Sequence, residues 1–433
     1  MYRLRPSLTC GRISSFAVAV LIFAGCAFAT TEKVVYSFGA APDGFGPGTA
    51  LVADSAGNLY GTTGAGGTAS CSCGTIFELS PPSISGGSWT ETTLYSFQGG
   101  TEDGAQPGGT LVFDSAGNLY GVTIKGGNNN GTAGTVFELS PPTSPGGSWT
   151  ETLLWAFQPN GRGGVTPGGL AMDAEGDLFG TGYQGGANRD GVVWELLKPR
   201  VGFNSLWVEK VLYSFGSVAN DGTNPSPNIV FRDGVIYGTT TGGCCGAVFE
   251  LVNHSGVWTE SILYRFTGVE GAEPIGGVVL DPAGNLYGPL YGSGSDPCSC
   301  GSVYELSPAA VAGDPWQETT LYTFTYHGDG GYPGGRLWRD KLGDLFGTAN
   351  EGGIKTGVGD QTYGTVFKLK APAVSGGAWI LQPLHDFGGM PANDGSLPEG
   401  QLTLVNGLLY GTTQLGGNNF TPGGGGTVFS VVP

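Results

Sequence analysis

A unit of 51 to 63 residues recurs seven times along the chain, and this repeat limits the folds that the chain can adopt. Residues 108–157 form a representative copy. They contain four short stretches rich in β-branched and aromatic residues, separated by Gly, Asn, Asp and Pro. Such a pattern predicts four β-strands joined by turns. Each copy ends in an aromatic anchor, which closes on Phe38, Phe97, Phe157, Phe215, Phe266, Phe324 and Phe387.

A four-stranded unit at this period is typical of a β-propeller blade. The two ends of the chain also complement each other. The last unit, residues 402–433, stops after its third strand, whereas a lone fourth strand, residues 33–38, precedes the first unit. We therefore predict an all-β, seven-bladed β-propeller with four-stranded blades, closed by the N-terminal strand completing the last blade. The alternative is an open β-solenoid, which predicts independent caps at its two ends.

Residues 1–29 differ from the repeats. A segment containing three arginines precedes an apolar run at 16–28, which ends in small residues. This pattern predicts a secretory signal peptide, followed by a single propeller domain over residues 30–433. Lipid attachment at Cys26 is a less favoured alternative. No other stretch is expected to span a membrane, so we expect a secreted protein, extracellular or periplasmic, and a monomer.

Acidic residues dominate the charge of the chain. It contains 35 Asp and Glu against 18 Lys and Arg, a net charge of −17. Removal of residues 1–29 takes away three arginines and leaves a net charge of −20. This balance argues against nucleic acid and anionic membrane surfaces as partners. Glycans or proteins fit better.

The wording of the repeat is specific. The pattern DxxGNLYGTT, then GGxxxxGTVFEL, then GGxWTExxLYSF runs over residues 34–433. It resembles the Gly-rich GloVer-type tandem-repeat family of secreted bacterial proteins. The resemblance implies an exported repeat protein, often attached to the cell surface, but it implies no activity, and no catalytic residue can be carried over. The sequence departs from the pattern at His385, where Tyr or Trp is usual, and at Lys368 and Ser430, where the third strand usually has Glu.

Acidic residues that recur in most copies are interpreted as structural. A third-strand glutamate is expected to form a hydrogen-bond tie within or between blades. Asp-Gly pairs in the blade-to-blade loops are expected to accept backbone hydrogen bonds in turns, with weak calcium binding as the alternative. No cofactor and no metal site are otherwise expected. The glutamates are Glu78, Glu138, Glu195, Glu250 and Glu305, and the aspartates are Asp43, Asp103, Asp221, Asp329 and Asp394.

Six cysteines lie in the second-to-third-strand loops, as three close pairs. An even number in an exported chain predicts disulfides. We predict three local bridges, although a link between blades 4 and 5 is also possible. Zinc is not favoured, because the pairs lie in different blades without a nearby histidine. The pairs are Cys71 with Cys73, Cys244 with Cys245, and Cys298 with Cys300.

Residues found in one blade are better candidates for function than residues found in all. Blade 6 places Arg336 at its first strand, which should line the channel, with Tyr332 and His327 in the preceding loop. Arg336 is expected to bind a carboxylate at the channel mouth, with one of these side chains beside it. Arg162 gives blade 3 a similar basic residue. Ordinary surface variation is the alternative that the sequence favours, since it contains no catalytic grouping.

The residues predict a binding or interaction module at or outside the cell surface, and no catalytic grouping stands out. Two alternatives remain. An extracellular carbohydrate-active lyase or hydrolase would place paired acid and base groups at the channel mouth. A purely structural surface protein would have no pocket.

Overall fold

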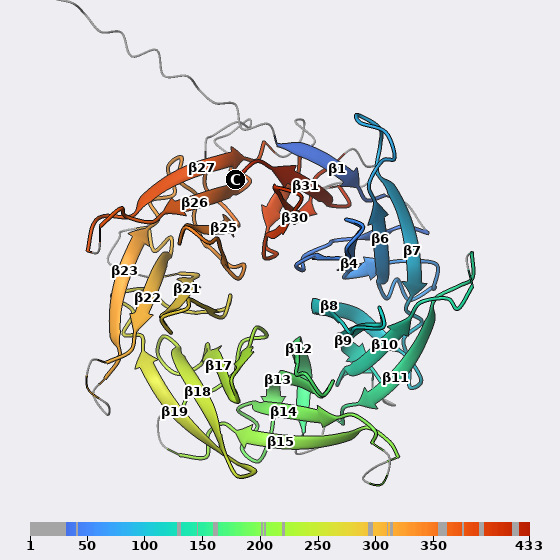
Figure 1. Ribbon diagram of the computed structural model, residues 1–433, viewed down its shortest axis with the longest axis horizontal. Helices are drawn as coiled ribbons and strands as arrows, with labels where there is room; N and C mark the ends of the chain where they lie inside the picture. The colour runs from blue at the N-terminus through green and yellow to red at the C-terminus, as the bar shows by residue number, and fades with distance from the viewer. Residues whose placement is uncertain are drawn as a thin grey trace, which may run out of the picture.

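Seven antiparallel β-sheets form a closed ring around a central channel, as the sequence predicts (Figure 1). The structure is a computed structural model. It describes residues 32–39, 42–127, 131–144, 146–158, 163–200, 202, 205–218, 221–292, 298–309, 311, 315–353, 362–374, 376–388, 394–417 and 424–433. None of these residues is helical. The predicted leader at 1–29, including Cys26, lies outside them.

Blades 1 to 6 each contain four strands in sequence order from the channel to the rim. Blade 1 has β3 (Val52–Ala53), β4 (Leu59–Thr63), β6 (Thr75–Ser80) and β7 (Thr90–Ser96). Blade 2 has β8 (Gly104–Phe113), β9 (Leu119–Gly126), β10 (Thr135–Ser140) and β11 (Thr150–Ala156). Blade 3 has β12 (Gly164–Met172), β13 (Leu178–Gly185), β14 (Val192–Leu197) and β15 (Val208–Ser214). Blade 4 has β16 (Val230–Arg232), β17 (Val235–Thr240), β18 (Ala247–His254) and β19 (Val257–Arg265). Blade 5 has β20 (Val279–Leu280), β21 (Leu286–Leu290), β22 (Ser302–Ser307) and β23 (Gln317–Thr323). Blade 6 has β24 (Trp338–Arg339), β25 (Leu345–Ala349), β26 (Thr365–Lys370) and β27 (Ile380–Asp386). A small separate pair joins β2 (Gly44–Phe45) to β5 (Ala65–Gly66).

Blade 7 combines strands from both ends of the chain. Its C-terminal strands are β28 (Ser396–Pro398), β29 (Thr403–Val405), β30 (Leu408–Leu415) and β31 (Thr427–Val431). The outermost strand is β1 (Lys33–Ser37), which pairs antiparallel with β31 and places Lys33 opposite Ser430. In Figure 1 the blue β1 accordingly lies beside the red β31. This pairing confirms the predicted closure and rules out the open solenoid.

The aromatic anchors hold neighbouring blades together. Each anchor phenylalanine is buried and contacts the third-strand aromatic of the next blade. Ring centroids are 5.2 Å apart for Phe97 and Phe137, and 4.9 Å apart for Phe38 and Phe77. Such edge-to-face pairs add to the free energy gained by burying the rings. The core is therefore a set of layers between blades, and the same contact recurs around the ring.

The second-strand glycine explains how these aromatics fit. A Cβ on Gly121 would lie 2.4 Å from Cζ of Phe137. The matching glycines of the other blades meet the same third-strand ring, so any larger residue would collide with it. Packing therefore requires the glycine of the recurring NLYG motif.

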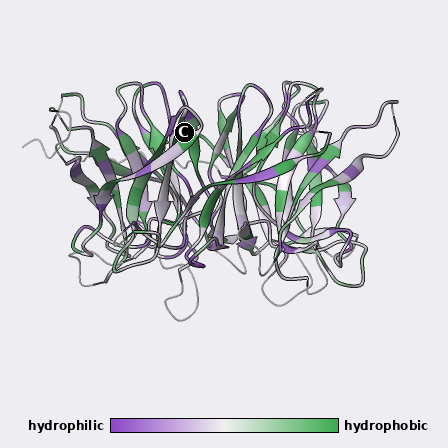
Figure 2. Cartoon of the chain, turned by 90° about the horizontal axis from the view of Figure 1, so that it is seen from below, coloured by the Kyte–Doolittle hydropathy of each residue, from purple (hydrophilic) through white to green (hydrophobic). Residues whose placement is uncertain are grey.

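The antiparallel order gives the ring two different faces. Tight turns between first and second strands lie on one face, and the blade-to-blade and second-to-third loops lie on the other. The tight turns are fixed by an aspartate such as Asp54, which accepts hydrogen bonds from the backbone of Ala56 and Asn58. Figure 2 shows the ring edge-on, with apolar strand residues between the two sets of loops. Binding residues are commonly held on long loops by a rigid scaffold, so a site is expected on the long-loop face.

Candidate binding site in the central channel

A cavity of about 310 Å³ lies at the centre of the ring. Its wall contains residues from six of the seven blades, mostly from the segments that lead into the first strands. Small residues bring the backbone close to the axis and leave the space open. Gly48, Gly109, Asn228, Ile275, Gly335 and Gly400 each represent one blade in this wall.

Arg336 is the basic residue of this wall. Its Nε donates a hydrogen bond to the backbone oxygen of Val278 in the neighbouring blade, at 3.1 Å. No carboxylate of the described residues forms an ion pair with its guanidinium. Burial lowers the pKa of Arg336, because the charged form loses hydration. A guanidinium has five N–H donors, so an anion that entered the cavity would find donors and a charge to neutralise.

Glu399 lies in the same wall and has different partners. The side-chain amide of Asn350 donates to its Oε1 at 3.1 Å, and the amide of Gln414 donates to its Oε2. Burial raises the pKa of Glu399, although these hydrogen bonds oppose the shift. The Oδ1 atom of Asn350 is buried and has no hydrogen-bond partner within the described part of the chain. The cavity wall thus contains the guanidinium of Arg336 and the carboxyl group of Glu399, which form no ion pair with each other. It also contains the amide oxygen of Asn350, which accepts no hydrogen bond from the described residues.

Three tyrosines connect the cavity with the long-loop face. Tyr291 lines the cavity, and its ring centroid lies 5.4 Å from that of Tyr332. Tyr326 packs against Tyr332 at 6.1 Å, and its hydroxyl donates to Oε2 of Glu351 at 3.0 Å. Tyr326 and Tyr332 belong to the loop between blades 5 and 6. Aromatic rings with a polar edge suit ligands that have both apolar and hydroxylated surfaces, such as sugars.

The residues singled out in the sequence do not all meet. Arg336 and Tyr291 line the cavity. Tyr332 packs against the ring of Tyr291 and is not part of the cavity wall. His327 is exposed, and its Nδ1 donates to the backbone oxygen of Thr325 at 2.7 Å, so it is held in its own turn. Arg162 lies outside the described residues. Carboxylate binding by Arg336 remains a prediction, and in the described residues His327 and Arg336 share no hydrogen bond.

Glu399 and Tyr291 were not singled out from the sequence. Glu399 follows a proline in the entry to blade 7, and Tyr291 follows a second strand, so neither belongs to a motif. The ring brings them to Arg336 from different repeats. Their one sequence signal is that other copies of the repeat lack them, which also holds for many loop residues.

The blade junctions contain a recurring polar contact. In five of them a tyrosine near the end of the outermost strand donates its hydroxyl to an acidic residue in the following loop. Tyr95 and Asp103 show the pattern, with 3.1 Å between the oxygens. Asp103 also accepts hydrogen bonds from the backbone N–H groups of Gln98 and Gly104. The pairs are Tyr36–Asp43, Tyr95–Asp103, Tyr213–Asp221, Tyr264–Glu270 and Tyr322–Asp329.

These contacts agree with the structural interpretation of the Asp-Gly pairs. The third-strand glutamates are structural too, as expected. Glu78 and Glu138 each accept a hydrogen bond from a serine two residues further along the strand, both at 3.0 Å.

The cysteines form two of the three predicted bridges. Cys71 is bonded to Cys73, and Cys298 to Cys300. Cys244 and Cys245 are free thiols whose Sγ atoms lie 2.7 Å apart. The predicted bridge between them is absent, because a disulfide between adjacent residues imposes geometry far from the favoured one. No bond links blades 4 and 5 among the described cysteines.

Comparison with known proteins agrees with the fold. The family model described as the Gloeobacter/Verrucomicrobia repeat matches residues 22–194, 90–251, 143–358 and 244–433. No protein with a curated description matches the chain. Among solved structures, polysaccharide lyase Uly1 is similar with a TM-score of 0.50 and 10% identity, over 89% of this chain and 90% of that one.

Two other solved structures are similar at lower TM-scores. A chain of the nidogen/laminin complex has a TM-score of 0.43 and 16% identity, over 80% of this chain and 98% of its own. PorZ, a surface component of the type-IX secretion system of Porphyromonas gingivalis, has a TM-score of 0.42 and 14% identity, over 82% of this chain and 43% of its own. At 10% identity, the similarity to polysaccharide lyase Uly1 shows the propeller fold alone. The overlapping family matches reach from residue 22 to residue 433, and the chain belongs to the Gloeobacter/Verrucomicrobia repeat family.

Proposed function

We propose that this β-propeller is an extracellular or cell-surface binding module whose central cavity takes a carboxylate-bearing sugar, such as a uronic acid at the end of a glycan. The observation that carries the proposal is Arg336. Its guanidinium is mostly buried in the cavity wall and has a single hydrogen bond within the described protein, to a neutral backbone oxygen. A buried cation without a counter-ion is costly, and a bound carboxylate would offset that cost through two parallel hydrogen bonds.

The size and the other groups of the cavity fit the same ligand. A volume of about 310 Å³ is at the small end of ligand pockets, which favours one sugar unit over a long oligosaccharide. Tyr291 offers a ring face, while Asn350 offers a buried amide oxygen to a sugar hydroxyl.

The net charge of −17 does not prevent such binding. Charges separated by more than about 8 Å in physiological salt are largely screened, whereas Arg336 would contact the ligand directly. The acidic surface should slow the approach of anions and make association faster at higher salt.

Extracellular placement is supported by the residues at 1–29 and by the cysteine pairs. A basic segment, an apolar run and small residues precede the first strand. Two cysteine pairs are oxidised in the structure, which is typical of compartments outside the cytoplasm. In the described residues, no helix has the length and apolarity needed to cross a membrane.

The test is calorimetric titration of the protein with glucuronate and galacturonate, with glucose as the neutral comparison. Binding of a uronate but not of glucose is expected. Arg336→Gln should weaken it about 10- to 100-fold, the effect of losing hydrogen bonds to a charged group. Lys341→Gln is the charge-matched control, because Lys341 is exposed in a tight turn away from the cavity. Equal affinities of the wild-type protein and Arg336→Gln would contradict the proposal.

A carbohydrate-active enzyme is the second candidate, and one observation favours it. Glu399 lines the same cavity as Arg336, and burial raises its pKa. A carboxyl group with a raised pKa can act as a general acid or base. Incubation with uronate-containing oligosaccharides, followed by product analysis, separates the two candidates. An enzyme would release products and lose turnover in Glu399→Gln while keeping affinity. A binding module would bind the oligosaccharide without releasing any product from it.

A further inference from the structure

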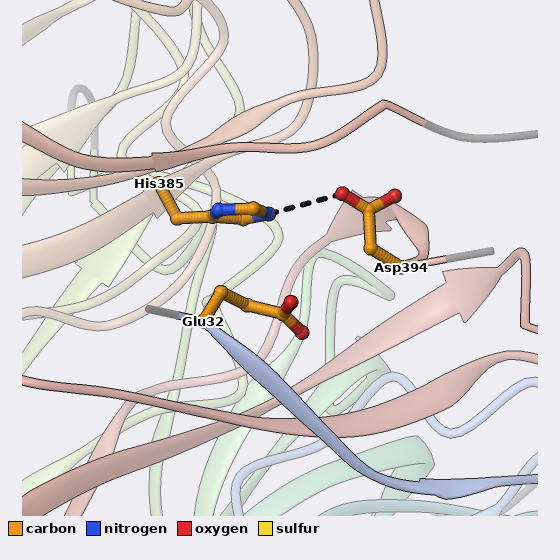
Figure 3. A group of neighbouring side chains, drawn as sticks. All are labelled: Glu32, His385 and Asp394. Carbon is orange, nitrogen blue, oxygen red and sulfur yellow. Dashed lines mark hydrogen bonds and ion pairs between the residues drawn. The ribbon is translucent and has the colours of Figure 1, made fainter. Parts of the chain in front are cut away.

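The junction between blades 6 and 7 differs from the others in one side chain. Where five junctions have a tyrosine, this one has His385, on β27. Its Nε2 lies 3.1 Å from Oδ2 of Asp394, the acidic residue of the following loop. Glu32 lies immediately before β1, and Figure 3 shows its carboxyl group and that of Asp394 near the imidazole ring. Glu32 takes the place that Glu151 has at the junction of blades 1 and 2.

The exchange of tyrosine for histidine changes what the junction can bind. The phenols at the other junctions have raised pKa values, because burial and neighbouring carboxylates disfavour the phenolate, so they are poor metal ligands. An imidazole nitrogen is a metal ligand in its neutral form. In this junction one nitrogen and two carboxylate oxygens, from Glu32, His385 and Asp394, all lie within 4.8 Å of one another.

Glu32 has an oxygen available for an ion. Its Oε1 is buried and has no hydrogen-bond partner among the described residues. Burial raises the pKa of this carboxyl to about 7. Glu151 and Glu260 also have an unpartnered Oε1 at their junctions, so this feature alone does not distinguish the site. The histidine does, because it adds the third ligand to two carboxylates that the fold already places together.

We propose that Glu32, His385 and Asp394 bind one divalent transition-metal ion, with Zn²⁺ as the best match. The site lies at the seam of the ring, the place where the start of β1 meets blades 6 and 7. One imidazole and two carboxylates suit zinc, and three protein ligands leave a position for water. Calcium is disfavoured, because it prefers six or more oxygen ligands. Zinc ligands at about 2.0–2.2 Å from the ion lie roughly 3.3–3.6 Å apart, and the three ligand atoms, all within 4.8 Å of one another, are near that spacing.

The position of the site gives the ion a role. Glu32 adjoins the N-terminal strand, His385 belongs to blade 6, and Asp394 lies just before β28 of blade 7. A bound ion would therefore fasten the start of β1, which reaches β31 through strand pairing alone, to blade 6 and to the loop that enters blade 7. The site is separate from the central cavity and does not depend on the function proposed for it.

The test is titration of the metal-stripped full chain with Zn²⁺, in a background in which Cys10, Cys26, Cys244 and Cys245 are replaced by Ala, so that no cysteine outside the two disulfides competes as a ligand. One ion per chain is expected, together with a rise in melting temperature that EDTA reverses. His385→Tyr restores the side chain of the other junctions, so it should fold normally, and its zinc binding should be lost. His327→Ala, which removes an exposed histidine, should still bind one ion.

A gain of binding provides an independent check. Tyr95→His places an imidazole beside Asp103 and Glu151, which repeat the two carboxylates of the seam. This variant should bind two zinc ions per chain. Absence of zinc binding to the parent protein, or binding that survives in His385→Tyr, would overturn the proposal. In that case the seam holds an ordinary His385–Asp394 ion pair.

Discussion

At the scale of single residues, glycine determines which side chains can hold the blades together. A second-strand glycine faces the third-strand aromatic in each blade, and the anchor phenylalanine of the preceding blade packs on that same aromatic. A methyl group at this position would therefore disturb packing inside a blade and between two blades. The glycine is fixed by close approach, and no positive φ is needed to explain it.

Gly121→Ala tests this requirement. The new Cβ would lie 2.4 Å from Phe137 and 2.8 Å from Leu111, so the unfolding free energy should fall by about 1–3 kcal/mol, the usual cost of overpacking. Gly64→Ala is the control, because its Cβ would meet nothing closer than 3.6 Å. Denaturant unfolding of both variants measures the difference. Equal stabilities would show that the blade yields at Gly121.

At the scale of elements, β1 carries out a task that no other strand has. It covers the free edge of β31 and also places Phe38 on Phe77 of blade 1. Its removal would leave an open edge in blade 7 and an empty anchor position between blades 7 and 1. Open edges promote pairing with other chains.

Deletion of residues 32–38 should lower the melting temperature and cause association. Loss of the Phe38 ring alone is expected to cost about 3–5 kcal/mol. A synthetic peptide with residues 32–38, added in trans, should restore the melting temperature, whereas a scrambled peptide should not. Light scattering and thermal unfolding measure both effects. A deletion variant as stable as the full chain would show that β1 does not close the ring.

The elements could be predicted from the sequence because strands, turns and anchors repeat in register. The two incomplete end units even revealed how the ring closes. Arg336 was predicted to line the channel, but the presence of Glu399 and Tyr291 in the same cavity could not be predicted, because the three residues come from different blades. His385 and Asp394 were noticed singly, but their meeting with Glu32 depends on β1 entering blade 7.

At the scale of the whole molecule, the junctions gather acidic side chains. Burial, assisted by the aspartate of the same junction, raises the pKa values of Glu91, Glu151 and Glu260 to about 7. The folded protein therefore binds more protons than the unfolded chain between about pH 4.5 and pH 7. These three groups stabilise the fold at low pH, and their contribution is lost as the pH rises through 7.

The melting temperature should consequently be higher at pH 5.5 than at pH 8. Thermal unfolding across this range measures the slope. Glu151→Gln should make the profile flatter, because it removes one of the titrating groups, and Glu102→Gln, at an exposed position, should leave the profile unchanged. A melting temperature that rises from pH 5.5 to pH 8 would contradict the raised pKa values.

The strand β1 has one more consequence, which concerns the order in which the chain is made. Lys33 leaves the ribosome long before its partner Ser430 is made. Blades 1 to 6 can each be completed from local sequence as they appear, but the seventh must wait, and such distant pairing is slow. A chain cut short anywhere before β31 keeps an unmatched edge that chaperones and proteases can recognise. Closure of the ring therefore depends on two strands that are made far apart in time.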